Sequence, residues 1–430
     1  GLAICEDLWK GEDVGFAHRY HGAPDPVECL ANAGATLIVS PSASPFLLGK
    51  GARHRALLAR HAQQRGLFVA SVNQVGGNDE LVFDGHSAVF DPSGSLIAAG
   101  PGFEEGLVVV DLPDPKETPR QGEPAPTDPL LAATAPELLF KAIRLGIRDY
   151  CRKTGFRTAV LGISGGIDSA VVAALGAAAL GPASITGLIL PGPYSSEHSK
   201  SDATELARRL GIATVTIPIG GPFQAFRGAL DPAFRSAGHA ALGERMPDIT
   251  EENLQSRIRG TTLMAWSNRT GAIVLTTGNK SELAVGYATL YGDMSGGLAP
   301  ISDVSKQQVY ALARWMNENA AARGFAGPPI PRSSLDKPPS AELRPGQTDQ
   351  DTLPPYDVLD AVIERYIERR QSPIRIARET RIDEGTVWRV VRLIDTAEYK
   401  RKQAAVGLKV TSVAFGSGRR VPIAQGWRAR

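Results

Sequence analysis

A short segment with two glycines, two serines and an aspartate is the part of this sequence best suited to bind a phosphate. It spans residues 160–169 and reads VLGISGGIDS. Glycines allow a tight turn and a close approach of the backbone to a ligand, and free amides at the start of a helix favour an anion. The serine hydroxyls add donors, and the aspartate can hold Mg²⁺ beside the anion. The residues expected to form this phosphate-binding loop are Gly162, Ile163, Ser164, Gly165, Gly166, Ile167, Asp168 and Ser169.

A cysteine near the start of the chain is the second residue that could carry chemistry. Cys5 follows the apolar stretch Leu-Ala-Ile and precedes Glu6 and Asp7. An isolated cysteine is more often a small buried core residue. Its position at the end of an apolar strand, directly before two acidic residues, favours the alternative of a nucleophile. We therefore predict that Cys5 is catalytic.

Alternating strands and helices must position the phosphate loop. The apolar run 159–163 predicts a buried strand, and the run after Ser169 predicts a buried helix. An amphipathic helix over 136–154 should lead into that strand. Such alternation predicts an α/β fold with a doubly wound parallel sheet covered by helices on both faces. Further strands are expected over 184–190, 213–219 and 271–276, helices over 199–210 and 254–268, a long ordered proline-rich loop over 326–355, and helices over 356–400.

A separate first domain is predicted over residues 1–112, followed by a linker over 113–135 and a second domain over 136–430. The linker prediction rests on its prolines and charges. Within the first domain, short apolar runs and turn residues predict the local structure. The expected elements are strands over 35–40, 67–72 and 106–111, a helix over 53–64 and a turn over 91–94.

The composition is that of an ordinary globular chain. Of the 430 residues, 43% are hydrophobic and 21% charged, and the net charge of +2 gives no strong attraction for nucleic acid or a membrane. Three cysteines are too few for a disulfide framework and predict a reducing, cytoplasmic location. No apolar run is long enough to span a bilayer. The first residue is Gly1, within an apparent strand, so we expect an amino-terminal truncation.

The phosphate loop is not a Walker loop, because no Gly-Lys-Ser/Thr follows its glycines. It resembles the SGGxDS loop of the ATP pyrophosphatases. Five further segments follow it in order and read ENLQSRIRGT from 252, LTTGNKSE from 275, YGD from 291, SAELRPGQ from 340 and EYKR from 398. Together they resemble glutamine-dependent NAD synthetases over residues 130–430. That resemblance implies an adenine nucleotide alpha hydrolase-like sheet, a homo-oligomer and ATP-dependent amidation of deamido-NAD through an adenylated nicotinate carboxylate.

The resemblance also assigns roles to individual positions. Residues 162–169, Thr277 and Lys306 would bind ATP, and Asp168 and Glu282 would bind Mg²⁺. One position departs from the family pattern, since Leu290 stands where ammonia-dependent relatives carry a lysine. The positions that match contacts to deamido-NAD are Asn253, Arg257, Glu282 and Lys400.

The first 112 residues resemble the carboxy-terminal part of a nitrilase-type amidase with an αββα fold. The segments SASPF from 42, VNQVG from 72 and FDGHS from 83 carry this likeness. By resemblance, Cys5 would attack the side-chain amide of glutamine, and Ser44 and Lys50 would bind glutamine. The family's general base, a glutamate, and its oxyanion-stabilising lysine precede the cysteine. We therefore expect this chain to use only free ammonia.

Other interpretations remain open from the sequence. Arg257 and Lys400 could lie on solvated faces, and Glu282 could be a favourable charge at a helix start. Residues 372–394 resemble a degenerate helix-turn-helix with Arg389 and Arg392 on its second helix, although a scaffold hairpin fits equally well. The chain could instead be another ATP pyrophosphatase amidotransferase such as GMP synthetase. It could also be a carbon-nitrogen hydrolase with a degenerate appended domain.

Overall fold

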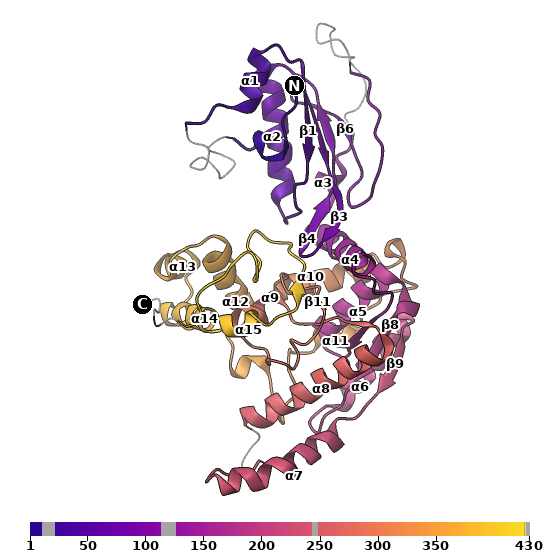
Figure 1. Ribbon diagram of the computed structural model, residues 1–430, viewed down its shortest axis with the longest axis vertical. Helices are drawn as coiled ribbons and strands as arrows, with labels where there is room; N and C mark the ends of the chain where they lie inside the picture. The colour runs from indigo at the N-terminus through magenta and orange to yellow at the C-terminus, as the bar shows by residue number, and fades with distance from the viewer. Residues whose placement is uncertain (11–21, 113–125, 243–247, 425, 427–430) are drawn as a thin grey trace. The chain divides into compact units, whose positions relative to one another are not determined.

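The computed structural model describes residues 1–10, 22–112, 126–242, 248–424 and 426 (Figure 1). The chain divides into two compact units, Gly1–Gly146 and Ile147–Arg430. The division lies inside helix α4 (Ala135–Thr154), which is the amphipathic helix predicted over 136–154. Among the described helices, none combines the length and the apolar character that crossing a membrane requires.

A four-stranded mixed sheet with helices packed against it forms the first unit. Its strand order is β1-β2-β5-β6, with β1 parallel to β2 and the other pairs antiparallel. A core of leucine, valine and phenylalanine side chains, including Leu57, Leu58 and Phe90, joins the sheet to α2. The elements are η1 (Cys5–Leu8), α1 (Pro26–Asn32), β1 (Leu37–Ser42), α2 (Lys50–Arg65), β2 (Phe68–Asn73), β3 (Val75–Asn78), β4 (Leu81–Asp84), β5 (Ala88–Phe90), β6 (Leu96–Ala99) and α3 (Pro129–Ala132).

Most predictions for this unit are confirmed, but the strand expected over 106–111 is wrong. Those residues form no regular structure, and Leu107 and Val109 are 90% and 84% exposed. A strand needs a hydrogen-bonded neighbour. The last strand of the sheet, β6, pairs with β5 and not with residues 106–111. The turn over 91–94 is present, since the Gly94 amide donates to the Asp91 carbonyl over 2.9 Å.

Residues 113–125 of the expected linker lie outside the described residues. The remainder of that range is not wholly irregular, because it contains α3. The helix begins at Asp128, whose side chain caps it and forms an ion pair with the buried Arg55 over 2.7 Å. The end of the expected linker is therefore packed into the first unit.

The second unit is built on a parallel sheet in the order β10-β7-β8-β9. Val160 of β7 packs in a cluster with Ile258 of α8, so its neighbour Leu161 points to the opposite face. Helices α5 and α6 contact the sheet and α8 contacts β7 and β10. The predicted doubly wound parallel sheet is confirmed. Its strands are shorter than expected and α8 is longer.

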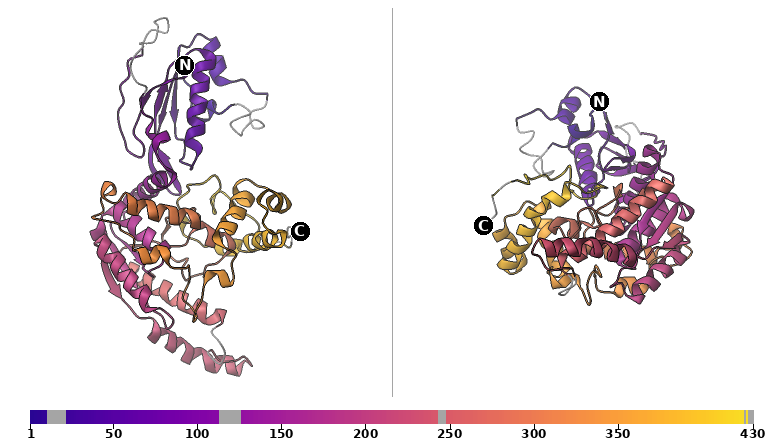
Figure 2. Two further views of the ribbon diagram at one scale, coloured as in Figure 1. Left: turned by 180° about the vertical axis from the view of Figure 1, so that it is seen from behind. Right: turned by 60° about the horizontal axis from the view of Figure 1, so that its bottom comes forward.

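The helices of the second unit pack on the sheet and in a carboxy-terminal group. Figure 2 shows α12 to α15 gathered together, and a separate core that includes Leu359, Val391 and Ile394 packs α12, α13 and α14 against one another. The elements are β7 (Ala159–Gly162), α5 (Ile167–Leu180), η3 (Pro182–Ser184), β8 (Ile185–Ile189), α6 (Glu197–Leu210), β9 (Ala213–Thr216), α7 (Gly220–Ser236), α8 (Ile249–Thr270), β10 (Ile273–Val274), α9 (Lys280–Val285), β11 (Leu298–Ala299), α10 (Lys306–Glu318), η4 (Ala321–Arg323), α11 (Arg332–Asp336), η5 (Asp349–Asp351), α12 (Tyr356–Ile363), η6 (Glu364–Glu368), α13 (Pro373–Thr380), α14 (Glu384–Thr396), α15 (Glu398–Arg401) and β12 (Val406–Gly407).

Candidate functional site

A cavity of about 630 Å³ in the second unit lies where the parallel strands end. Its lining includes Gly162 at the end of β7, Leu190 just after β8 and Thr276 just after β10. Ligands of open α/β sheets bind outside the carboxyl ends of the strands. Every residue of the second unit that the sequence assigned to a site lines this cavity, except Gly165.

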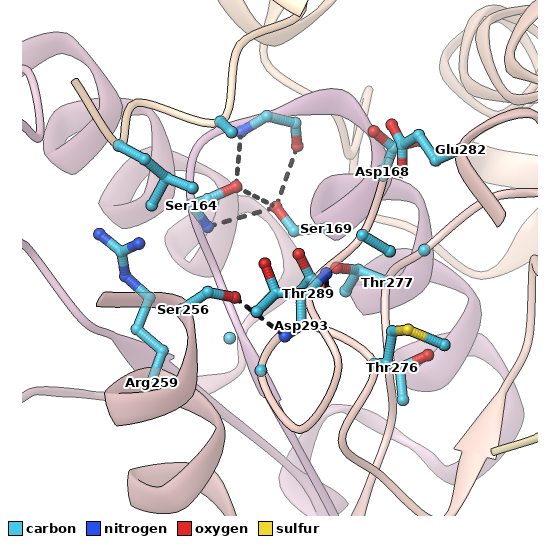
Figure 3. Close-up of a pocket in the computed structure, with 18 of the residues that line it drawn as sticks. Ser164, Asp168, Ser169, Ser256, Arg259, Thr276, Thr277, Glu282, Thr289 and Asp293 are labelled. Atoms are coloured by element: carbon cyan, nitrogen blue, oxygen red, sulfur yellow. Dashed lines mark hydrogen bonds between the residues drawn. The ribbon is translucent and has the colours of Figure 1, made fainter. Parts of the chain in front are cut away.

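The phosphate loop has the geometry that its sequence predicts. Gly165 has a φ of +77°, and a Cβ added there would lie 2.6 Å from the Ser199 carbonyl oxygen, so only glycine fits. The Ser164 and Ser169 hydroxyl oxygens are 3.2 Å apart, and the Gly166 amide donates to Ser164 Oγ over 3.3 Å (Figure 3). Two hydroxyls and the start of α5 therefore lie together at the cavity wall.

A buried ammonium group joins the two carboxylates that the sequence paired. Lys306 Nζ lies 2.6 Å from Asp168 Oδ2 and 3.0 Å from Glu282 Oε1. Figure 3 shows the Asp168 and Glu282 side chains beside each other. Asn279 Nδ2 donates to the other Asp168 oxygen over 2.9 Å. The predicted proximity of Asp168 and Glu282 is present, and Lys306 lies between them.

Burial and mutual charge shift the pKa values of this group. Burial, with the nearby Asp168 charge, raises the pKa of Glu282 to about 7 although Lys306 opposes the shift. For Lys306, burial alone would lower the pKa, but the Asp168 and Glu282 carboxylates raise it above its ordinary value. The ammonium is therefore held charged, as an anion-binding group must be.

A second wall of the cavity is formed by α8 and the loop after α9, with Lys400 of α15 beside them, and it holds three of the four residues expected to contact the acceptor, Asn253, Arg257 and Lys400. Asn253 Oδ1 accepts a hydrogen bond from Thr289 Oγ1 over 2.9 Å. The Thr289 amide donates to Asp293 Oδ1 over 2.7 Å, and the Asp293 amide donates to Ser256 Oγ over 3.1 Å (Figure 3). This network fixes the 289–293 turn against α8.

Two basic side chains hold the same turn through its carbonyl groups. Arg257 Nε donates to the Leu290 carbonyl over 3.2 Å, so the residue that departs from the family pattern contributes its backbone. Lys400 Nζ donates to the carbonyls of Gly286 and Ala288, each over 2.7 Å. Burial lowers the pKa of Lys400. Arg257, Lys400 and Asn253 all line the cavity. Their spacing in the sequence could not show that they meet there.

Several polar residues at the cavity were not selected from the sequence. Burial raises the pKa of Asp293 to about 6, with backbone amides and nearby cations opposing, and burial lowers the pKa of Arg259 to about 10. Glu342 has a φ of +48° and accepts from Ser199 Oγ over 2.8 Å and from Lys337 Nζ over 2.7 Å. Asp293 and Glu342 lie in sequence segments that carried the family resemblance. Their place in those segments was the sequence signal that could have selected them as site residues.

Thr277 lies just beyond β10, as expected, and lines the cavity. Its labelled neighbour Thr276 lies close to it in Figure 3. The residues assigned to ATP and to the acceptor therefore meet at one cavity, although nothing in it distinguishes the two ligands by itself.

Cys5 lies in the first unit, at the start of the 3₁₀ turn η1. Its φ of +47° is uncommon for a residue with a side chain. Residues in such conformations concentrate at functional sites, where surrounding structure maintains the strain. The side chain is partly exposed and forms no disulfide. These features are compatible with a nucleophile and differ from those of the buried Cys151.

Ser44 and Lys50 are in direct contact in the first unit. Lys50 Nζ donates to Ser44 Oγ over 2.6 Å and lies 5.5 Å from the centre of the Trp9 ring. Asn73 fixes the Ser44 backbone, because its Oδ1 accepts from the Ser44 amide over 2.8 Å and its Nδ2 donates to the Ser44 carbonyl over 3.2 Å. The structure thus brings together the two positions assigned to glutamine.

The segment that resembles a helix-turn-helix is part of the scaffold of the second unit. Helices α13 and α14 bury Ile376, Val387 and Val390 in the carboxy-terminal core. Arg389 donates to the Thr352 carbonyl, and Arg392 donates to the Trp388 carbonyl over 3.3 Å. Both arginines therefore have roles within the fold.

Comparison with known proteins matches both units to families. The NAD synthase family model matches residues 139–404, and the carbon-nitrogen hydrolase model matches residues 21–118. A glutamine-dependent NAD(+) synthetase from Synechocystis sp. is 45% identical over 425 residues, which are 99% of this chain and 72% of that protein. A relative of the same name from Thermotoga maritima is 43% identical over 454 residues, covering 98% of this chain and 74% of the relative.

Solved structures agree with the sequence comparison. The structure of glutamine-dependent NAD+ synthetase from Acinetobacter baumannii in complex with ADP has a TM-score of 0.67 and 36% identity, covering all of this chain and 73% of that one. A glutamine-dependent NAD(+) synthetase from Cytophaga hutchinsonii has a TM-score of 0.77 at 22% identity, which is evidence for the fold alone.

Proposed function

Because this chain belongs to the glutamine-dependent NAD(+) synthetase family, a group of glutamine-hydrolysing ligases, we propose that its cavity adenylates and then amidates the nicotinate carboxylate of deamido-NAD. One observation carries the proposal. The phosphate loop, the Asp168–Lys306–Glu282 group and the set Asn253, Arg257 and Lys400 all line one cavity of about 630 Å³. Two substrates can therefore meet there.

The phosphate end of the cavity is suited to the triphosphate of ATP. Anions are stabilised at the start of a helix, and α5 begins at Ile167 with the Ser164 and Ser169 hydroxyls beside it. The buried Lys306 ammonium adds a full positive charge, and the depth of the site strengthens it because the local dielectric is low. We assign ATP to this end of the cavity, with Thr277 beside it.

Mg²⁺ fits the chemistry of the donors at this end. The ion takes oxygen ligands and usually binds through one or two carboxylates together with substrate phosphates. Asp168 and Glu282 supply two neighbouring carboxylates, each in contact with Lys306 Nζ, and these carboxylates would hold the ion beside the ammonium. No larger cluster of acidic, histidine or cysteine ligands occurs among the described residues, so the phosphates would complete the shell. When bound, the ion neutralises the departing pyrophosphate.

The second wall is assigned to deamido-NAD. Arg257 and Lys400 give that wall two cations, and Asn253 adds an amide that can recognise a hydroxyl or a carboxylate. Glu282, which contacts Lys306, is assigned to both ligands. Thr289 and Asp293 fix the turn of the acceptor wall by hydrogen bonds within the protein. Such preorganisation reduces the cost of orienting the substrate.

The proposed reaction proceeds in two steps that the residues support by charge and position. A nicotinate carboxylate oxygen attacks the α-phosphorus of ATP, the bond to the β-phosphate oxygen breaks, and pyrophosphate leaves. The product is a mixed anhydride with a good leaving group. Ammonia then attacks its carbonyl carbon, the carbon–oxygen bond to AMP breaks, and a proton is lost to give the amide. Stabilising the phosphate charge is the main contribution of the protein.

In the first unit we propose that Cys5 is the nucleophile towards the glutamine amide, with Ser44 and Lys50 binding the glutamine. The contact between Ser44 and Lys50 and the φ of +47° at Cys5 support this assignment.

Release of AMP tests the proposal directly. The chain is incubated with ATP, Mg²⁺ and ammonia, together with either deamido-NAD or XMP. We expect AMP and NAD to form in equal amounts with deamido-NAD and no AMP to form with XMP. Absence of AMP with deamido-NAD would refute the proposed function.

A further inference from the structure

Four consecutive residues at the start of α9, Asn279 to Glu282, contact other parts of the second unit. Three of them lead directly to the proposed ATP site. Asn279 Nδ2 donates to Asp168 Oδ1, Glu282 Oε1 contacts Lys306 Nζ, and the Lys306 amide donates to Ser281 Oγ over 2.9 Å. The position of this short segment therefore sets how the carboxylates and the ammonium meet.

The fourth residue, Lys280, points away from the ATP site into a buried group of charges. Its side chain is 2% exposed, and its Nζ lies 2.8 Å from Glu368 Oε1 and 3.0 Å from Asp303 Oδ1. It also donates to Thr411 Oγ1 over 2.7 Å and to the Val413 carbonyl over 3.1 Å. Lys280 does not line the cavity, so it cannot touch a substrate there.

The partners of Lys280 are themselves anchored to the carboxy-terminal segment. Asp303 Oδ2 accepts from the amides of Val410 and Thr411 over 2.8 and 2.7 Å. Glu368 ends the π-helical turn η6, and its second oxygen accepts from Ser412 Oγ over 3.2 Å. Single π-helical turns within helices occur frequently at functional sites. The ammonium thus joins α9 to two segments that are distant from it in sequence.

We propose that Lys280 is a positioning residue for the ATP step, and this inference rests on the function proposed above. Its ammonium holds the start of α9 against Asp303, Glu368 and the 410–413 segment. Through the adjacent Asn279 and Glu282, it fixes the separation of the two carboxylates that face ATP and Mg²⁺.

A neutral side chain could not replace this ammonium without movement. Removing one partner of a buried charge pair leaves the remaining charges without compensation. Here two carboxylates, Asp303 and Glu368, would repel each other in a buried environment, and the chain would have to open to admit water. The start of α9 lies directly beside them, because the Lys280 amide also donates to the Val304 carbonyl over 2.9 Å. Displacement by about 1 Å at a reacting site can lower the rate by about 100-fold.

The test compares K280M with K141M in the 430-residue chain. The control makes the same chemical change at a partly exposed lysine, which pairs with Glu137 one turn away on α4. We measure AMP release with deamido-NAD and ammonia, and separately the rise in melting temperature that Mg²⁺ plus ATP produce without deamido-NAD. The second readout reports binding and does not depend on turnover.

K280M is expected to keep its fold but to lose about 100-fold in kcat. Its KM for deamido-NAD should stay within about twofold of the wild-type value, because other contacts fix the acceptor wall. The ATP-dependent rise in melting temperature should shrink. K141M should match the wild type in all three measurements. A folded K280M with wild-type kcat and a wild-type response to ATP would overturn the inference.

A milder variant covers the case in which K280M does not fold. T411V removes the Thr411 hydroxyl, which accepts from the Lys280 ammonium and donates to Asp303, but keeps both carboxylates. We expect kcat to fall by roughly 3- to 10-fold with the same pattern. Unchanged kcat in T411V, with unfolded K280M, would mean that Lys280 serves stability alone and would overturn the inference. If the wild type releases no AMP, the proposed function fails, and the ATP-dependent melting shift still decides the role of Lys280.

Discussion

Replacement of Lys306 by methionine provides the sharpest test of how the phosphate end of the cavity is held together. The substitution keeps a similar volume but removes the ammonium between Asp168 and Glu282. Each carboxylate side chain is only 18% exposed, so water can compensate little for the lost charge. We therefore expect the folded state of the second unit to lose stability even in the absence of substrate.

The magnitude follows from the two contacts. At 2.6 and 3.0 Å, each carboxylate attracts the ammonium by about 6 kcal/mol if the effective dielectric constant is about 20. Burying the ammonium costs several kcal/mol, which offsets part of this attraction. Leaving buried charge without its partner typically costs about 3–5 kcal/mol, and this is the loss of unfolding free energy that we expect for K306M.

The assay is urea denaturation followed by circular dichroism, with K141M as the control. Lys141 forms a surface pair with Glu137, so its replacement should change the unfolding free energy by less than about 1 kcal/mol. The double variant K306M/E282Q removes one of the two uncompensated carboxylates. Its loss of unfolding free energy should therefore be smaller, by about 1–3 kcal/mol, than the sum of the losses measured for K306M and for E282Q.

Two results would refute this reasoning. If K306M lost no more stability than K141M, the carboxylates would have to be solvated or protonated, and the ammonium would not hold them together. If the effects of K306M and E282Q simply added, Glu282 would not depend on the Lys306 charge.

Three further predictions concern the phosphate loop, the acceptor wall and the first unit. G165A should abolish most ATP-dependent activity, because the added Cβ would lie 2.6 Å from the Ser199 carbonyl oxygen at a φ of +77°. ATP-dependent AMP release measures the loss, and a wild-type rate of AMP release would contradict the prediction. Burial raises the pKa of Asp293 to about 6, so the folded protein keeps a proton that the unfolded chain loses. The free energy of unfolding should therefore fall as the pH rises from about 4 to 6, by about 3 kcal/mol at most. In D293N, the unfolding free energy measured with urea should change less with pH across that range. The same pH dependence in D293N and the wild type would contradict the role of the buried carboxyl group. C5S should leave the ammonia-dependent rate unchanged, because Cys5 belongs to the other unit; a large loss in a steady-state assay would show that the cysteine serves the amidation step.

Local sequence signals determined much of the scaffold. The strand, loop and helix around the phosphate loop were predictable because β7 and most of α5 are apolar and glycines separate them. The helices after residue 356 were predicted correctly as well. The family was identified correctly from ordered segments, and the comparisons confirm it.

Prediction failed where structure depends on neighbours that the sequence does not specify. Residues 106–111 have the apolar residues of a strand, but within the described part of the chain no strand pairs with them, and Leu107 is exposed. The strands of the parallel sheet came out shorter than predicted, since pairing ends where the neighbouring strand ends. Strand propensity reflects packing against neighbours more than an intrinsic backbone preference.

Local sequence patterns were enough to predict a phosphate loop on a parallel α/β sheet and a nucleophilic role for Cys5. The contact of Lys306, 138 residues after Asp168, with both Asp168 and Glu282 became visible in the folded structure. The folded structure also showed that Lys280 turns away from them to bind the carboxy-terminal segment. The physical reason is that loops and helices follow from local steric and apolar patterns, whereas a charge finds its partners only when folding brings distant segments together and removes water from around them.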